Sequence, residues 1–364
     1  MTLRASIEKL LAVRNPGPVA GLLLLPLTIC SLLFGWVTAI RSRLYRCGML
    51  RTERIACRLI AVGNLTVGGT GKTPTVCHIA RHLAASGLRV AVLCRGYRGS
   101  RTDRPQVVSD GRSICTGQEA VGDEAYMLAG KLPGIPVLAA KDRVAAGHMA
   151  VEQFQTQVAV LDDGFQYRRL KRDLDLVLVN CRSPFGNGFL LPRGTLREHP
   201  CALEKAPAVL LTRADAAASG TAAAAAAVGR YNPEARIFTS VFKPACLIAA
   251  ADAHHLGPEA LRHKRVAGLC SIGDPESFFG MLDALGAETV CRLAFPDHHA
   301  YRRDDYAAIA RGTRQCDYIV TTEKDIAKID INMIQVEKLY ALEIQLVIDD
   351  EEDFFRYVRE KAGM

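Results

Sequence analysis

The residue types best suited to chemistry lie in a glycine-rich stretch at 64–74, which follows a strand-like apolar run at 57–63. The stretch contains three glycines and ends in Gly71-Lys72-Thr73-Pro74. Glycines let backbone N–H groups converge on phosphate oxygens, a lysine can reach the β- and γ-phosphates of a nucleotide, and a threonine hydroxyl can bind Mg²⁺. The pattern therefore predicts a nucleotide phosphate site. Its expected residues are Thr66, Val67, Gly68, Gly69, Thr70, Gly71, Lys72 and Thr73.

One position departs from the usual spacing of such a loop. The first glycine of the G-x-x-x-x-G-K-[ST] pattern would fall at position 66, where this chain has Thr66. An ordinary strand-to-helix turn would also explain the glycines. It gives no reason for Lys72 and Thr73 behind them, so the phosphate site remains the prediction.

A second candidate group is the acidic pair Asp162 and Asp163, which follows the apolar run 158–161. An apolar strand that ends in aspartate can bring a carboxylate beside the Mg²⁺ of a bound nucleotide. Two adjacent acids at a buried strand end are costly unless a cation or a basic group neutralises them. A pair of helix-capping aspartates is the alternative. We expect Asp162 to be the metal-side carboxylate because it ends the strand.

The elements that must position these residues alternate along the chain. Helical patterns separate the strand-like runs at 57–63, 89–94, 158–161, 174–179 and 208–211. This alternation predicts an α/β fold whose mainly parallel sheet has helices on both faces, as in P-loop nucleotide-binding proteins. A second, smaller α/β block starts at residue 265. We expect an N-terminal membrane anchor at 1–45, a nucleotide-binding domain at 46–240 and a C-terminal α/β domain at 241–364.

The turn Thr212-Arg213-Ala214-Asp215 follows the last strand-like run of the first block. It resembles the [NT]-K-x-D turn with which GTP-binding proteins recognise a base, with arginine in place of lysine. Four residues carry little information, and an ordinary capped turn is the simpler explanation. Base contact and a structural turn both remain open for this segment.

Composition excludes several classes of protein. The 364 residues are nearly half apolar, so the chain can bury a large core. Its 12 cysteines are scattered without a C-x-x-C pair, which speaks against a disulfide framework or a structural zinc site and favours reduced thiols in the cytosol. The net charge of +8 is modest and spread out, so we expect no nucleic-acid partner and instead contact with an anionic surface.

The segment at 15–40 contains no charged residue and is long enough for the roughly 20 residues that a bilayer span requires. A cleaved signal peptide is disfavoured because Arg41, Arg43 and Arg46 follow in place of a small-residue cleavage site. Pro26 would kink a straight helix, so the segment could also lie in the membrane interface. A buried core helix is a further alternative. Basic flanks and a downstream nucleotide site predict that the body of the protein is cytoplasmic.

Several separate blocks together resemble one family, the tetraacyldisaccharide 4′-kinases, which are the lipid A 4′-kinases of Gram-negative bacteria. The blocks are 63–74 (GNLTVGGTGKTP), 95–97 (RGY), 121–124 (VGDE), 162–166 (DDGFQ), 191–194 (LPRG) with 196–198 (LRE), 295–298 (FPDH) and 320–325 (VTTEKD). The resemblance implies ATP and Mg²⁺ as cofactors. It implies transfer of the γ-phosphate to the 4′-hydroxyl of an acylated glucosamine disaccharide 1-phosphate at the inner leaflet of the bacterial inner membrane. Two α/β domains with the active site in the cleft between them are implied as well.

The resemblance also implies roles for individual residues. Asp123 matches the catalytic base and His298 the histidine that assists it. An N-cap role explains Asp123 equally well from sequence alone, and the neighbouring His299 leaves the choice of histidine ambiguous. Acids expected near Mg²⁺ are Asp162 and Glu124, together with the hydroxyl of Thr73. The residues expected near the substrate are Asp163 and Arg197.

A function of a different class is also compatible with the phosphate loop. A membrane-associated P-loop ATPase or GTPase that acts as a switch would transfer its phosphate to water, and it would use the turn at 212–215 to select a base. That reading gives no reason for the Asp-His block at 297–298. Protein partners and oligomeric state are left open by the sequence.

Overall fold

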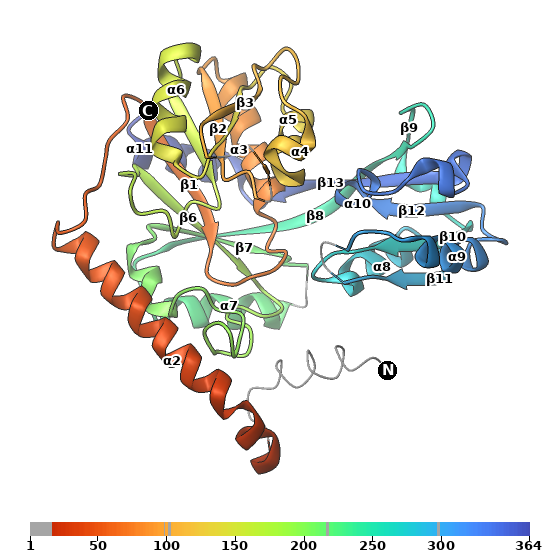
Figure 1. Ribbon diagram of the computed structural model, residues 1–364, viewed down its shortest axis with the longest axis horizontal. Helices are drawn as coiled ribbons and strands as arrows, with labels where there is room; N and C mark the ends of the chain where they lie inside the picture. Colours follow the sequence, from red (N-terminus) through yellow and green to blue (C-terminus); the bar gives the residue numbers. More distant parts are fainter. Residues whose placement is uncertain (1–16, 98, 101–102, 216–217, 297–298) are drawn as a thin grey trace. The chain divides into compact units, whose positions relative to one another are not determined.

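The computed structural model describes residues 17–97, 99–100, 103–215, 218–296 and 299–364. It divides into two units, which are considered separately. The first unit contains the chain up to Val241 together with Val347–Met364, and the second contains Phe242–Leu346. Figure 1 labels the helices and strands of both.

A mainly parallel sheet forms the first unit, as predicted. Its strands are β1 (Arg58–Asn64), β2 (Val90–Cys94), β3 (Gln106–Ser109), β4 (Val137–Ala139), β5 (Val158–Asp162), β6 (Leu174–Asn180) and β7 (Ala208–Thr212). They lie in the order β7-β6-β1-β5-β2-β4-β3, and the start of β8 (Arg236–Ala249) pairs with β7. The edge strand β3 is antiparallel to its neighbour β4. Because β5 pairs directly with β1, the carboxyl ends of these two strands meet at one edge of the sheet.

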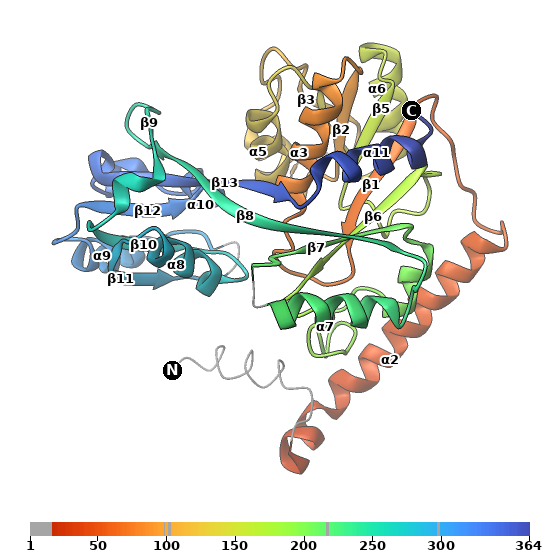
Figure 2. The same cartoon turned by 180° about the vertical axis from the view of Figure 1, so that it is seen from behind.

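Helices connect these strands and cover the sheet (Figures 1 and 2). They are α3 (Lys72–Ala85), α4 (Gln118–Val121), α5 (Asp123–Lys131), α6 (Arg143–Phe154), α7 (Ala218–Gly229) and a 3₁₀ turn at Pro200–Lys205. Two of them begin at residues whose local chemistry favours a helix start. Gly71 precedes α3 in the left-handed conformation, with φ 85°, and the Asp142 carboxylate caps α6 by accepting the N–H of Val144 at 3.1 Å. Apolar side chains fill both faces of the sheet, for example Leu59 and Leu93 on one face and Ile60 and Val92 on the other.

The C-terminal helix α11 (Glu351–Ala362) belongs to the first unit, so the expected domain at 241–364 needs correction at its end. Phe354 and Phe355 are fully buried, and the Phe355 ring stacks on His82 of α3 with 3.4 Å between ring centroids. The side chain of Glu351 in α11 lies 2.9 Å from Nε2 of His78 in α3. Phe355 packs against α3, and Phe354 packs edge-on against Phe238 of β8 with 5.0 Å between ring centroids.

At the other end of the chain, α2 (Pro18–Arg46) is a 29-residue helix that contains Pro26. Within the residues described, it is the one helix whose length and composition would allow it to cross a membrane. Its outward face is apolar and exposed. The residues with the largest exposed fractions there are Val19, Leu22, Leu23, Leu32, Trp36 and Val37.

The second unit contains a smaller, mainly parallel sheet. Its strands β10 (Arg265–Cys270), β11 (Glu288–Ala294), β12 (Tyr318–Thr322) and β13 (Leu339–Ile348) lie in the order β11-β10-β12-β13. The short β9 (His255–Leu256) pairs with the end of β8. Helices α8 (Pro275–Ala284), α9 (Arg303–Gly312) and α10 (Glu323–Ile326) and 3₁₀ turns at Pro258–Leu261, Ile331–Met333 and Val336–Lys338 complete it.

Candidate active site

The predicted phosphate loop lies between β1 and α3, at the carboxyl edge of the sheet. Gly68 and Gly71 adopt positive φ angles of 111° and 85°, which a residue with a Cβ disfavours. Asn64, the last residue of β1, organises the loop from inside. Its amide donates to the Thr66 carbonyl at 2.7 Å and to the Thr70 hydroxyl at 2.8 Å, and its carbonyl oxygen accepts from Lys72 Nζ at 3.2 Å. The sequence reading did not assign a function to Asn64, although an asparagine that ends a buried strand was a usable signal.

The two aspartates behind β5 have different environments. Asp162 is 6% exposed, and its Oδ1 finds no hydrogen-bond partner among the residues described. Burial, reinforced by the neighbouring Asp163 charge, raises the pKa of Asp162 to about 7. A buried carboxyl group with a free oxygen and a raised pKa would gain from a nearby cation. Helix capping, the alternative role for this pair, does not apply to Asp162, since it ends a strand.

Asp163 is already neutralised by two basic residues. Its carboxylate lies 2.7 Å from a guanidinium nitrogen of Arg197 and 3.6 Å from Lys72 Nζ. Burial alone would raise the pKa of Asp163, but the charges of Lys72 and Arg197 hold it below its ordinary value. The structure therefore brings together three residues that the sequence singled out separately.

Arg197 is carried by the segment 187–197, which we call the brace loop. This loop forms backbone contacts with the start of the phosphate loop. The Val67 N–H donates to the Thr195 carbonyl at 2.7 Å, and the Arg197 N–H donates to the Leu65 carbonyl at 2.7 Å. The Pro/Gly-rich segment is thus part of the wall of the phosphate site.

Asp123 and Glu124 occupy the first turn of α5. The preceding Gly122 has φ 86°, and a Cβ there would lie 2.0 Å from the Tyr97 carbonyl oxygen, so only glycine fits. Asp123 accepts a hydrogen bond from the Gln118 side chain at 2.9 Å. The negative charge of Glu124 contributes to the raised pKa of Asp162. The start of α5 therefore interacts electrostatically with the aspartate pair.

Of the two candidate histidines, the structure describes His299. His298 lies outside the described residues. The adjacent His299 bonds through Nε2 to Asp305 Oδ2 at 2.8 Å, and its ring stacks on Phe295 with centroids 4.9 Å apart. His299 is therefore held by its own unit, which is the behaviour of a structural histidine.

The turn at 212–215 also lies at the carboxyl edge of the sheet. Arg213 has φ 61°, and its guanidinium donates to the Gly69 carbonyl of the phosphate loop at 3.3 Å. The segment that resembled a base-recognition turn thus contacts the phosphate loop through its arginine. Base contact itself stays a prediction.

Comparison with known proteins places this geometry in one family. Residues 22–362 match the family model described as tetraacyldisaccharide-1-P 4′-kinase. The chain belongs to this kinase family. A tetraacyldisaccharide 4′-kinase from Anaeromyxobacter dehalogenans (strain 2CP-C) is 41% identical over 87% of this chain and 84% of the relative, and one from Desulfatibacillum aliphaticivorans is 36% identical over 99% and 98%.

A solved structure agrees with these sequence relatives. LpxK from Aquifex aeolicus, whose crystal structure was determined in complex with ATP, superimposes with a TM-score of 0.73 at 29% identity. The match covers 93% of this chain and 98% of that one. The predicted fold class and the predicted kinase family are both confirmed.

Arg143 is a basic residue at the site that sequence reasoning missed. It begins α6, is buried, and its guanidinium lies over the Tyr167 ring at 4.6 Å. Burial lowers the pKa of Arg143, and the charge of Asp163 acts in the opposite direction. A tetraacyldisaccharide-1-P 4′-kinase handles several phosphate charges, so a buried arginine beside the aspartate pair suits the family. The N-capping Asp142 before it marked the start of α6, but nothing local marked Arg143 as buried.

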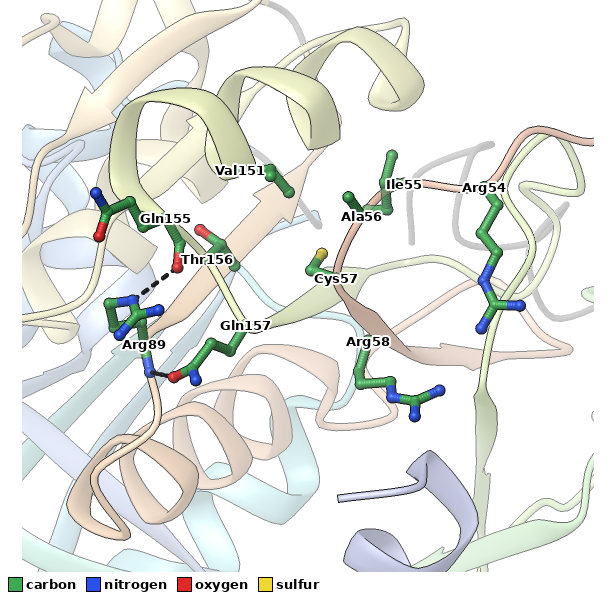
Figure 3. Close-up of a pocket in the computed structure, with 10 residues that line it drawn as sticks. All are labelled: Arg54, Ile55, Ala56, Cys57, Arg58, Arg89, Val151, Gln155, Thr156 and Gln157. Carbon is green, nitrogen blue, oxygen red and sulfur yellow. Dashed lines mark hydrogen bonds between the residues drawn. The ribbon is translucent and has the colours of Figure 1, made fainter.

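One recess in the first unit lies away from the nucleotide site. It has a volume of about 800 Å³ and is lined by residues at the amino ends of β1, β2 and β5, including Cys57, Arg89 and Gln157 (Figure 3). The phosphate loop follows the carboxyl end of β1. The kinase site and this recess therefore lie at opposite edges of the same sheet.

Proposed function

We propose that this chain transfers the γ-phosphate of ATP to the 4′-hydroxyl of a tetraacylated glucosamine disaccharide 1-phosphate, which forms lipid IVA in lipid A biosynthesis. The observation that carries the proposal is the family match over 22–362. It is supported by a phosphate loop whose lysine, aspartate pair and arginine lie together at one edge of the sheet.

The residues supply what phosphoryl transfer to a sugar needs. The glycine loop and Lys72 bind the β- and γ-phosphates and neutralise charge that develops on them. A sugar hydroxyl is a poor nucleophile, so a group must accept its proton. We assign that role to Asp123, which begins a helix and accepts a hydrogen bond from Gln118. His298 is our candidate for the second member of the proton-accepting pair.

Mg²⁺ fits the donor set at this edge. It binds through one or two carboxylates and phosphate oxygens and keeps several waters, so it needs few protein ligands. Asp162 offers a buried carboxylate with an unpartnered oxygen in the part of the chain described, and we assign the Thr73 hydroxyl and Glu124 to the same group. When bound, the ion would neutralise the transferring phosphates.

Asp163 and Arg197 are assigned to the substrate side of the transfer. Their ion pair, at 2.7 Å, keeps the guanidinium oriented beside the phosphate loop. An arginine held in this way can meet a phosphate in a bidentate manner. The γ-phosphate and the 1-phosphate of the acceptor are the two candidates for that contact.

For localisation, we propose the cytoplasmic face of the bacterial inner membrane, with α2 lying in the interface. A helix that crossed the bilayer would be surrounded by lipid. Here Ser31, near the middle of α2, is buried against the brace loop, while the outward face is apolar. One-sided apolar exposure is typical of interfacial helices.

The decisive experiment uses γ-labelled ATP and the acylated disaccharide 1-phosphate in lipid vesicles. Label in the lipid product supports the kinase, and Lys72→Ala serves as the matched inactive control. Label found only in free phosphate would instead identify a nucleotide-hydrolysing switch.

A further inference from the structure

The inner face of α2 makes a specific polar contact with the brace loop. Ser31 is only 3% exposed, although α2 is otherwise largely exposed and apolar. Its hydroxyl donates to the Leu190 carbonyl at 2.6 Å and accepts the Arg193 N–H at 3.0 Å. One turn later, a Cβ at Gly35 would lie 2.7 Å from Leu190 Cδ1. Two successive turns of the helix thus approach the same loop residue closely.

Hydrogen bonds within the brace loop make it rigid. The contact with α2 therefore affects the part of the loop that adjoins the phosphate loop. The Gly194 N–H donates to the Leu190 carbonyl at 2.9 Å, and the Leu191 N–H donates to the Leu196 carbonyl at 2.9 Å. Arg193 is 1% exposed, and its guanidinium lies over the Phe189 ring at 4.6 Å. A loop fixed in this way moves as one piece, so a shift at Leu190 displaces its far end.

That far end is paired with the start of the phosphate loop. The Val67 N–H bonds to the Thr195 carbonyl and the Arg197 N–H to the Leu65 carbonyl, and these two bonds form the antiparallel bridge between Thr66 and Leu196. Arg197 also holds Asp163. The first half of the phosphate loop and one of its acids therefore depend on where the brace loop lies.

We propose that Ser31 and Gly35 of α2 are positioning residues for the nucleotide site, which they act on through the brace loop. The helix that meets the lipid surface is in this view also a structural part of the ATP site and not a separable anchor. Of the measurements that test this inference, only the one of turnover rests on the proposed kinase function. Removing the hydroxyl leaves the buried Arg193 N–H without this partner. Displacement of catalytic groups by about 1 Å can cost up to about 10²-fold in rate.

The test compares Ser31→Ala with Thr38→Ala in the full-length protein on vesicles. Thr38 is a matched control because, among the residues that the structure describes, its hydroxyl bonds within α2, to the Gly35 carbonyl at 2.9 Å. We expect Ser31→Ala to lower kcat about tenfold and to weaken binding of a fluorescent ATP analogue several-fold, since loop placement affects both. Thr38→Ala should match the unmodified protein, and both variants should sediment with vesicles equally. Ser31→Thr, which keeps a hydroxyl, should recover most of the loss.

Hydrogen exchange separates positioning from loss of folding. In Ser31→Ala, amides at 65–67 and 190–197 should exchange faster, while those of the distant strand β2 should not change. Unchanged nucleotide affinity and unchanged exchange at 65–67 would overturn the proposal, as would equal losses in Thr38→Ala. An unmodified protein that binds the ATP analogue but does not label lipid would refute the kinase function alone, because the binding and exchange results still decide the role of Ser31.

Discussion

At the scale of single residues, Lys72 connects the two halves of the nucleotide site. Its ammonium lies 3.2 Å from Asn64 Oδ1 and 3.6 Å from Asp163 Oδ1. Lys72→Ala removes the charge that compensates the β- and γ-phosphates, so we expect kcat to fall on the order of 10²-fold or more. Lys171→Ala, which removes an exposed lysine, is the control for net charge. Near-normal turnover of Lys72→Ala in the labelled-ATP assay would contradict the phosphate-loop assignment.

Asp175 on β6 gives a prediction about pH. Burial raises the pKa of Asp175 from 3.8 to about 6, even though Arg172 Nε lies 3.1 Å away. A carboxyl group whose pKa is higher in the folded state stabilises the fold fully below the unfolded value, near pH 4, and this stabilisation is lost as pH rises through 6. Asp175→Asn should therefore be more stable than the unmodified protein at pH 8, by about 1–2 kcal/mol.

The advantage of Asp175→Asn should shrink toward zero as the pH falls to 4, when the aspartate is neutral in both states. Arg172 keeps other partners in this variant, since it donates to the carbonyls of Gly164 and Phe165 at 3.1 and 2.9 Å. Urea unfolding across the pH range measures the effect. A difference that does not change with pH would show that burial does not control this carboxyl group.

At the scale of elements, α2 can be tested through the single tryptophan of the chain. Trp36 is 73% exposed on the apolar face of the helix. If α2 lies in the interface, vesicles should shift the Trp36 emission to shorter wavelength. Lipids brominated near the headgroup should then quench it more than lipids brominated at the chain ends. Because Trp36 lies close to the end of the uncharged stretch at 15–40, the variant Trp36→Phe with Ile29→Trp moves the single tryptophan to the middle of the stretch, where a spanning α2 would reverse that order of quenching.

Two packed helices also show how an element far along the chain supports the site. Helix α3 begins directly after the phosphate loop, and α11 covers it through Phe355 and Glu351. The last turn of α11 adds Arg359, whose guanidinium lies 3.5 Å from His82 Nε2. The C-terminus thus stabilises the helix on which Lys72 and Thr73 stand.

At the scale of the whole molecule, the packing of the C-terminal helix α11 on the first unit gives a stability prediction. Phe355→Ala removes a fully buried ring from the first unit, so we expect a loss of about 3–5 kcal/mol in the free energy of unfolding. Glu352→Ala, an exposed change in the same helix, should have little effect. ATP binds the folded state and should recover part of the loss in thermal unfolding. Equal midpoints for the two variants would mean that α11 does not support the first unit.

The sequence by itself determined the features that depend on neighbouring residues. The order apolar strand, glycine loop, lysine and helix predicted the phosphate loop, because backbone sterics and phosphate binding act over about ten residues. The alternation of strands and helices predicted a mainly parallel sheet, and the uncharged stretch at 15–40 predicted the long apolar helix.

Only the tertiary structure decided which distant segments meet. Arg197 pairs with Asp163 across 34 positions, Ser31 bonds to Leu190 across 159, and α11 packs back on α3. Arg143 looked like any charged residue at a helix start, yet it is buried beside the acids. These contacts depend on strand order and on which apolar faces pack together. A local pattern determines that a face is apolar, whereas its partner is determined by the packing of the whole chain.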